Sequence, residues 1–316
     1  MLVITLKKIL VFCDPGIDDT IALIYAFQNP EIEVVGIVAE YGNTNRRFAV
    51  RNVQYLLSLL GKTDVPVFSG AERALSGEEP VAHPTIHGDF GLGPFTPPDT
   101  DESLRENFCD LIQLLERYSD ELTIVTLGRL TSLGMLFLLY PNLMSRITNY
   151  HIMGGAFFVP GNVTPVAEAN IYGDPTAALI VMKFAKNITL FPLNITDHIY
   201  ITPELAEQLD VVGCEGILYP ILDFYYSFYQ SQIPDIEGSP VHDLIPMIAL
   251  TNPEWFTLKN YLIYIQKEVG IARGITSADM RPYETLPPAP IHKVATKMNM
   301  THFEEHLLDI MTRKPD

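Results

Sequence analysis

The chain has 316 residues, of which 47% are hydrophobic and 19% charged, so it can bury a sizeable core in one large domain. Its formal net charge of −17 argues against a surface that binds nucleic acid or an anionic membrane. Three scattered cysteines (Cys13, Cys109 and Cys214) form no CxxC pair, which argues against a metal site on sulfur and fits reduced thiols in a cytoplasmic protein. No run reaches the roughly 18 consecutive apolar residues that a membrane span needs.

Strands and helices are expected to alternate from the N-terminus. Residues 8–13, "KILVFC", form a short continuous apolar run, which predicts a buried strand. Two lysines follow the first apolar stretch and no small-residue cleavage site appears before Asp14, so we interpret the N-terminus as this strand and not as a signal peptide. The next expected elements are a helix over 20–29, a strand over 31–40, a helix over 42–62 that closes near Gly61, and a strand over 64–70.

Residues 71–101 interrupt this alternation, because they are rich in proline and glycine and show little periodicity. Such a long irregular stretch is often a functional loop. The alternation then resumes, with expected helices over 108–119, 130–141 and 174–186 and expected strands over 121–128, 146–155 and 187–196. We expect mostly helical structure over 202–252 and two strands or a hairpin over 261–274.

This order of elements predicts an α/β fold in one domain over residues 1–316. We expect a mostly parallel central sheet flanked by helices on both faces, as in a Rossmann-like open sheet. Ligands of such sheets gather at the carboxyl ends of the strands. The positions to consider are therefore residues 14–19, residues 41–43, Leu127 with Gly128, and Met153 onward.

The turn "DPGIDD" carries Asp14, Asp18 and Asp19 between two apolar elements. Helix capping accounts for one or two of these aspartates, but not for Asp14 at the strand end. Three like charges within a short turn repel unless a proton or a cation relieves them, and carboxylate oxygens suit Ca²⁺ or Mg²⁺. A nucleophilic aspartate of a haloacid-dehalogenase-like phosphatase is the alternative. Those enzymes usually carry a second aspartate two residues on, where this chain has Gly16, so the match fails.

Two further segments carry polar residues outside any regular periodicity. In residues 161–175, Asn162, Glu168 and Asn170 offer donors and acceptors for vicinal hydroxyls, although asparagine is also common in turns for backbone reasons. His242 and Asp243 open an apolar helical stretch, where ordinary capping is the alternative reading.

Taken together, these motifs occur in the order seen in one enzyme family. They are "DPGIDD" at 14–19, "GN" at 42–43, "HGDFGLG" at 87–93, "LGRLTSLG" at 127–134, "MGGAFFVPGNVTPVAEANIYGDPTAA" at 153–178 and "HD" at 242–243. The sequence resembles the inosine–uridine-preferring nucleoside N-ribohydrolases from about residue 8 to about residue 280.

The resemblance implies a Ca²⁺-dependent hydrolase for purine or pyrimidine ribonucleosides, giving ribose and the free base. The N-glycosidic bond would break through an oxocarbenium-like transition state, with a metal-bound water activated by Asp14. The implied ligands of the ion are the carboxylates of Asp14, Asp19 and Asp243 and the backbone carbonyl of Leu127. The resemblance also implies a cytoplasmic enzyme of nucleoside salvage that forms a homodimer or homotetramer.

The resemblance assigns substrate contacts to seven residues: Asp18, Asn43, His87, Met153, Asn162, Glu168 and Asn170. His242 matches a histidine that protonates the leaving base in some members. Tyr225 and Tyr229 share a helical face, so they either pack as ordinary aromatics or line the base pocket, where we place Tyr229, and relay a proton. Which group is the leaving-group acid, and which base is preferred, stays open.

The chain also departs from the family pattern. Phe12 stands where the family often has aspartate, and Ala169 stands where it usually has an aromatic residue. Arg129 and Ser132 replace a common proline and asparagine, and Leu244 replaces the proline that usually follows the His–Asp pair. A nucleoside-binding relative with impaired catalysis is therefore an alternative. A Ca²⁺-stabilised structural protein is a weaker one, because it leaves the Asn–Glu–Asn set without a role.

Overall fold

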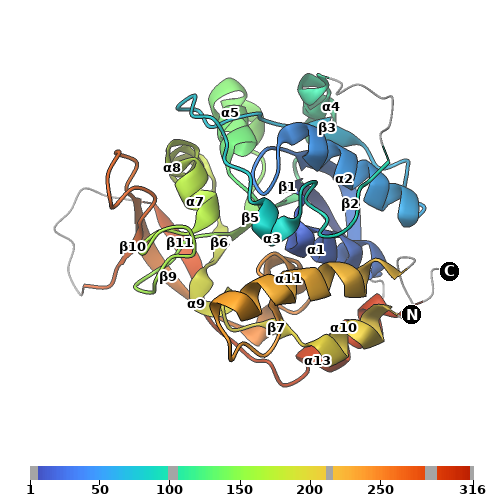
Figure 1. Ribbon diagram of the computed structural model, residues 1–316. Coiled ribbons are helices and arrows are strands. Elements are labelled where there is room, and N and C mark those ends of the chain that lie inside the picture. The colour runs from blue at the N-terminus through green and yellow to red at the C-terminus, as the bar shows by residue number, and fades with distance from the viewer. Residues whose placement is uncertain (1–5, 99–105, 211–215, 282–289, 314–316) are drawn as a thin grey trace.

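The computed structural model describes residues 6–98, 106–210, 216–281 and 290–313. Within these ranges the strands are β1 (Lys7–Cys13), β2 (Ile32–Ala39), β3 (Val67–Ser69), β4 (Thr123–Thr126), β5 (Asn149–Met153), β6 (Ile188–Phe191), β7 (Tyr200–Ile201), β8 (Ser239–Pro240), β9 (Phe256–Ile265), β10 (Thr276–Asp279) and β11 (Ile291–Met298). Nine of them form one sheet in the order β10-β9-β11-β6-β5-β4-β1-β2-β3 (Figure 1).

The sheet is parallel from β11 to β3, and antiparallel pairing is confined to β9 with its two neighbours. Parallel neighbours require crossover connections, which the intervening helices provide. The predicted α/β fold with a mostly parallel sheet is therefore confirmed. The two short strands β7 and β8 pair separately, away from this sheet.

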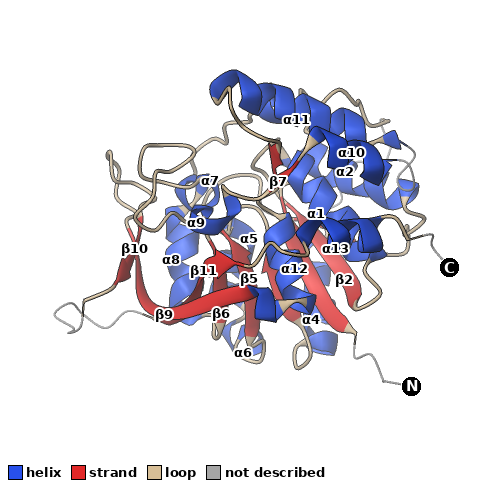
Figure 2. Ribbon diagram, turned by 90° about the horizontal axis from the view of Figure 1, so that it is seen from below, coloured by secondary structure: helices blue, strands red, loops and turns tan. Residues whose placement is uncertain are grey.

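The α-helices that accompany the sheet are α1 (Ile17–Gln28), α2 (Arg46–Leu59), α3 (Pro84–His87), α4 (Leu111–Tyr118), α5 (Thr131–Leu139), α6 (Pro141–Met144), α7 (Ala169–Gly173), α8 (Pro175–Phe184), α9 (Leu193–Thr196), α10 (Pro203–Asp210), α11 (Leu218–Gln232), α12 (Leu244–Thr251) and α13 (Phe303–Met311). Figure 2 shows helices on both sides of the strand layer.

Two hydrophobic cores lie on the two faces of the sheet, and β1 contributes to both. Ile9, Val11 and Cys13 pack into the core that holds α1, α11, α12 and α13. The alternate residues Leu10 and Phe12 pack into the core that holds α4, α5 and α8. Burial on both faces explains why β1 is a continuous apolar run instead of an alternating one. Phe12, which departs from the family pattern, is a core residue in this fold.

Most predicted elements form close to their expected positions. α1 begins at Ile17, three residues before the expected start, and Gly61 adopts a φ of +63° just beyond the end of α2. The strand expected over 187–196 ends at Phe191, because Pro192 lacks a backbone donor and α9 follows. The pair of strands expected over 261–274 forms as the antiparallel β9 and β10, but β9 begins earlier, at Phe256, and β10 starts at Thr276, beyond the expected range.

Some expectations concern parts of the chain that the structure does not describe. Residues 1–5 of the N-terminal apolar stretch and Cys214 lie outside the described ranges. Cys13 and Cys109 are free thiols. In the described part of the chain, no helix combines the length and the apolar character needed to cross a membrane.

Candidate active site

A cavity of about 600 Å³ opens at the carboxyl ends of the parallel strands, where the topology predicts a ligand site. It lies in the size range of small-molecule pockets. Its lining includes all seven residues that the family resemblance assigns to substrate, together with Tyr229, one implied metal-ligand carboxylate, the leaving-group histidine and Leu127. These residues are Asp18, Asn43, His87, Leu127, Met153, Asn162, Glu168, Asn170, Tyr229, His242 and Asp243. Asp14 and Asp19 are almost fully buried and are not part of the lining.

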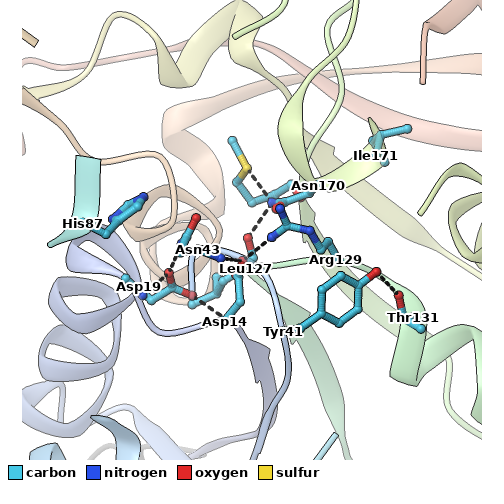
Figure 3. Close-up of polar contacts among 12 residues, drawn as sticks. Asp14, Asp19, Tyr41, Asn43, His87, Leu127, Arg129, Thr131, Asn170 and Ile171 are labelled. Carbon is cyan, nitrogen blue, oxygen red and sulfur yellow. Dashed lines mark hydrogen bonds and ion pairs between the residues drawn. The ribbon is translucent and has the colours of Figure 1, made fainter. Parts of the chain in front are cut away.

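The turn between β1 and α1 positions Asp19. One Asp19 oxygen, Oδ2, accepts a hydrogen bond from the backbone N–H of Gly16 at 3.0 Å, and the other, Oδ1, accepts one from the N–H of Asp14 at 3.2 Å. The Asn43 side-chain amide also donates to Asp19 Oδ2, at 3.0 Å (Figure 3). Asp19 therefore does cap the start of α1, and the same contacts fix its carboxylate beneath the cavity.

Three carboxylates converge at the cavity floor. Asp18, Asp19 and Asp243 each offer an oxygen within 4.8 Å of the other two, and all three are buried. Burial and, after it, the neighbouring Asp19 charge raise the pKa of Asp18 to about 8. Burial is also the main cause of the raised pKa values of Asp19 and Asp243.

The donor set of this cluster fits a hard divalent cation. Asp18 Oδ1 is buried and has no hydrogen-bond partner in the described structure. A buried, unpartnered carboxylate oxygen beside two other carboxylates is costly unless a proton or a cation balances it. All three donors are oxygens, as Ca²⁺ prefers. The cluster thus contains the predicted ligands Asp19 and Asp243, and it adds Asp18, which the sequence assigned to ribose.

The Asp14 carboxylate has hydrogen-bond donors that the three clustered carboxylates do not share. Its Oδ2 accepts a hydrogen bond from Arg129 Nη1 at 2.7 Å and another from the backbone N–H of Asn43 at 2.8 Å (Figure 3). Burial raises the pKa of Asp14, and the Arg129 charge opposes that shift. The sequence marks Arg129 as a departure from the family pattern but carries no signal for a partner 115 positions away. A metal contact for Asp14 stays a prediction.

Asn170 contacts two other expected site residues, Leu127 and Met153. Its side-chain amide donates to the Leu127 carbonyl oxygen at 2.6 Å and approaches Met153 Sδ at 3.3 Å (Figure 3). The Leu127 N–H donates to the Phe12 carbonyl, which holds this end of β4 against β1. The Leu127 carbonyl is therefore already hydrogen-bonded, and its role as a metal ligand stays a prediction.

The segment before α7 brings Asn162 and Glu168 to the cavity wall. Glu168 accepts backbone hydrogen bonds from Gly155, Asn170 and Ile171 at 2.7–3.1 Å. Burial raises the Glu168 pKa, and these hydrogen bonds oppose the shift. Asn162 Oδ1 accepts a hydrogen bond from Ala169 N–H at 3.0 Å. Asn162 thus stabilises a local turn, as the alternative reading of this segment proposed, and Glu168 caps α7. Both side chains also line the cavity.

Aromatic residues of α11 form another wall. The hydroxyl oxygens of Tyr225 and Tyr229 are 3.5 Å apart and their rings 4.9 Å apart, which confirms that they share a helical face. The His87 ring lies 5.5 Å from that of Tyr225, and its Nδ1 accepts a hydrogen bond from Ile17 N–H. Burial raises the pKa of both tyrosines, so both hydroxyls keep their protons at neutral pH.

His242 reaches the cavity from the turn before α12. Its Nδ1 lies 3.0 Å from Thr196 Oγ1 and 3.9 Å from Asp197 Oδ1. Burial lowers the pKa of His242 to about 4, so the ring is neutral at pH 7. Asp197 follows α9 and also lines the cavity, although no sequence motif singles it out.

Comparison with known proteins assigns the family. The family model described as "Inosine-uridine preferring nucleoside hydrolase" matches residues 9–305. Uridine nucleosidase 1 of Arabidopsis thaliana is 34% identical over 278 residues, which cover 86% of this chain and 82% of that protein. The pyrimidine-specific ribonucleoside hydrolase RihA of Escherichia coli O9:H4 (strain HS) is also 34% identical, with coverage of 86% and 88%.

A solved structure extends the likeness to the whole fold. The plant nucleoside hydrolase PpNRh1 is 32% identical and matches with a TM-score of 0.91, over 98% of this chain and 99% of its own. The sequence match, the fold and the residues gathered around the cavity agree. The chain therefore belongs to the inosine-uridine preferring nucleoside hydrolase family and is an N-glycosyl hydrolase.

Proposed function

We propose that the protein hydrolyses the N-glycosidic bond of ribonucleosides in a Ca²⁺-dependent reaction that gives ribose and the free base. One observation carries this proposal. The buried cluster of Asp18, Asp19 and Asp243 lies at the floor of a nucleoside-sized cavity. Because two relatives are named for uridine and pyrimidine ribonucleosides, uridine is the first substrate to test.

The cation would be held by the predicted ligands, which are the carboxylates of Asp14, Asp19 and Asp243 and the Leu127 carbonyl. Asp18, which offers an oxygen within 4.8 Å of Asp19 and Asp243, would lie beside the cation and face the ribose. A bound divalent cation would lower the pKa of a water at this site and polarise it for attack. Asp14 would take the proton from that water. In the described structure both hydrogen bonds to its carboxylate fall on Oδ2, so Oδ1 is the oxygen that remains for this task.

The ribose would be held by the polar residues along the cavity wall. Asn162, Glu168 and Asn170 are fixed by short backbone and side-chain hydrogen bonds, so little reorganisation is needed when a sugar binds. Negative charge from Asp18 and Glu168 would favour the positive charge that develops at the anomeric carbon.

The leaving base would meet His242 and the Tyr225–Tyr229 pair. Thr196 lies against His242 Nδ1, so Nε2 is the ring nitrogen that remains to contact the base. Tyr229 would donate its proton to the departing base and regain one from Tyr225, whose hydroxyl is 3.5 Å away. General acid catalysis of this kind contributes roughly 10²–10⁴-fold to a rate.

The proposal is tested by incubating the protein with uridine, inosine and nicotinamide riboside and measuring the release of reducing sugar. Ribose release that requires Ca²⁺ is the expected result. Binding of nucleosides by calorimetry without ribose release would instead indicate a binding protein. The ion pair between Asp14 and Arg129 is the observation that favours this second candidate, because it occupies the proposed base.

We further propose that the enzyme works in the cytoplasm as a homodimer or homotetramer. Support comes from the resemblance to the family and from the sparse, scattered cysteines of the sequence. Sedimentation velocity of the full chain would measure the assembly state, and a monomer at micromolar concentration would contradict the proposal.

A further inference from the structure

Asp197 is a carboxylate on the cavity wall to which the mechanism above assigns no role. The carboxylates that line the cavity are those of Asp18, Glu168, Asp197 and Asp243. Asp18 and Asp243 belong to the cluster at the floor, and Glu168 accepts three backbone hydrogen bonds. Asp197 is therefore the lining carboxylate whose charge still needs an explanation.

The side-chain oxygens of Asp197 retain acceptor capacity. The side chain is 42% exposed, and its Oδ1 lies 3.9 Å from His242 Nδ1, which is longer than a hydrogen bond. The His242 ring is neutral at pH 7, so it does not balance the carboxylate. Burial raises the pKa of Asp197 to about 6, and no hydrogen bond from a described residue opposes that shift.

Hydrogen bonds of the backbone fix the place of Asp197. Its N–H donates to the Leu193 carbonyl at 3.1 Å, at the end of α9, and the Tyr200 hydroxyl donates to its carbonyl oxygen. The N–H of Ile199 donates to the Thr196 carbonyl within the same turn. The carboxylate is thus held at the cavity by a defined turn between α9 and β7.

Asp197 lies beside the groups that are proposed to meet the base. Its Oδ1 is close to His242, and its charge contributes to the raised pKa of the Tyr229 hydroxyl. Apolar residues that also line the cavity suit the flat face of a base, namely Phe228, Ile236 and Pro240. A base held between these groups would turn one polar edge toward Asp197.

The chemistry of a carboxylate decides which edge it favours. An ionised carboxylate only accepts hydrogen bonds, so it attracts an N–H group and repels the lone pairs of a carbonyl. Among the described residues that line the cavity, none is a lysine or an arginine that would donate to a carbonyl there. A site that hydrogen-bonds one substrate discriminates against an analogue that leaves its polar group unpaired.

We propose that Asp197 is a specificity-determining residue that accepts a hydrogen bond from an exocyclic amino group of the base. Cytidine would then be preferred to uridine, and adenosine to inosine, because each preferred base carries an amino group where its counterpart carries a carbonyl. This inference rests on the proposed function, because it assumes that a ribonucleoside occupies the cavity.

The ratio of kcat/KM for cytidine to kcat/KM for uridine tests this inference. It is measured with Ca²⁺ at pH 8, where Asp197 is ionised. Asp197→Asn keeps the shape and supplies an amide that donates to a carbonyl, so the ratio should fall about tenfold. Asp197→Ala should lower the ratio less, because alanine offers uracil no donor. The two glycosidic bonds differ in intrinsic lability, but this difference cancels when variants are compared with the wild type.

Asp235→Asn is the matched control. Asp235 is exposed and does not line the cavity, so removal of its charge should leave the ratio unchanged. An equal fall in this variant would mean a general effect of charge and would overturn the inference. A carboxylate that only supported His242 or the ribose would affect both nucleosides alike, so an unchanged ratio in Asp197→Asn would overturn it as well.

Calorimetry provides a second measurement that needs no turnover. In an Asp14→Asn background with Ca²⁺, cytidine should bind more tightly than uridine, and Asp197→Asn should remove this preference. A wild type that releases no ribose, beside an Asp197-dependent preference in binding, would overturn the proposed hydrolysis and support this inference. A wild type that hydrolyses both nucleosides with a ratio that Asp197→Asn does not change would overturn this inference alone.

Discussion

Asp14 and Arg129 form an ion pair in the catalytic centre, with Oδ2 and Nη1 2.7 Å apart and both side chains less than a tenth exposed. Removing one member of a buried pair typically costs about 3–5 kcal/mol, because the other charge is left unpaired. Any test of Asp14 as the base must therefore separate loss of chemistry from loss of stability.

Asp14→Asn should abolish ribose release while the protein stays folded. Asparagine retains an oxygen that accepts from Arg129 and Asn43 but cannot take a proton, so we expect a fall of about 10³-fold or more in kcat. Asp14→Ala should lose activity and lower the free energy of unfolding more than Asp14→Asn does, because alanine removes the hydrogen-bond acceptor as well as the charge. Steady-state kinetics and urea unfolding measure the two effects. An asparagine variant with near-normal kcat would remove Asp14 as the base.

Removal of divalent cations should inactivate the enzyme, and Ca²⁺ should restore it. The buried carboxylates of Asp18, Asp19 and Asp243 offer oxygens within 4.8 Å of one another, so their charges repel unless a proton or a cation balances them. Ribose release is measured after chelation and dialysis, then after addition of Ca²⁺. Asp19→Asn should weaken this restoration, because Asp19 is at the centre of the hydrogen-bonded turn. Full activity of metal-free protein would exclude the metal.

Metal-free protein should lose stability as the pH rises from about 4 to about 8. The pKa of Asp18 lies near 8 in the folded state against an ordinary 3.8, so across this window the folded state retains a proton that the unfolded state has lost. The free energy of unfolding then falls with pH. Urea denaturation at pH 5, 6, 7 and 8 measures the slope.

Saturating Ca²⁺ should reduce this slope, because it stabilises the ionised carboxylates of the cluster. Glu40 is a control, since burial raises its pKa to about 8 as well, while its hydrogen bonds go to Ser132. The contribution of Glu40 to the slope should persist with Ca²⁺ and should be absent in Glu40→Gln. A metal-free protein whose stability rises over this window would contradict the raised Asp18 pKa.

Tyr229→Phe should lower kcat roughly 10²-fold if its hydroxyl protonates the leaving base. Tyr225→Phe should have a smaller effect of the same sign, because it only completes the hydroxyl pair. Tyr226→Phe is the matched control, since its hydroxyl donates to the Ile236 carbonyl, and its kcat should be unchanged. A different outcome would assign the proton of the leaving base to His242. In that case His242→Gln would lower kcat, whereas Tyr225→Phe and Tyr229→Phe would leave it unchanged.

Local sequence patterns were sufficient for the fold and for the location of the site. The apolar run of β1, the Pro–Gly turn after it and the helical period of α2 each reflect short-range geometry, so they predict their own elements. Alternation of such elements implies a parallel sheet, and a parallel sheet brings its polar loop residues to one edge. The family motifs then named about half of the residues that line the cavity, but not, for example, His83, Asp197 or Tyr200.

The tertiary structure decided the partners of those residues. Asp18, instead of Asp14, joins Asp19 and Asp243 in the three-carboxylate cluster, and Asp14 pairs with a residue 115 positions away. Likewise, His242 meets Thr196 only because α9 and the turn before α12 converge. Composition and spacing determine which elements form, whereas contacts between distant residues depend on how each side chain is directed when the elements pack. The sequence by itself therefore determined the family and the place of the catalytic centre, and the packed fold determined which charges face one another within it.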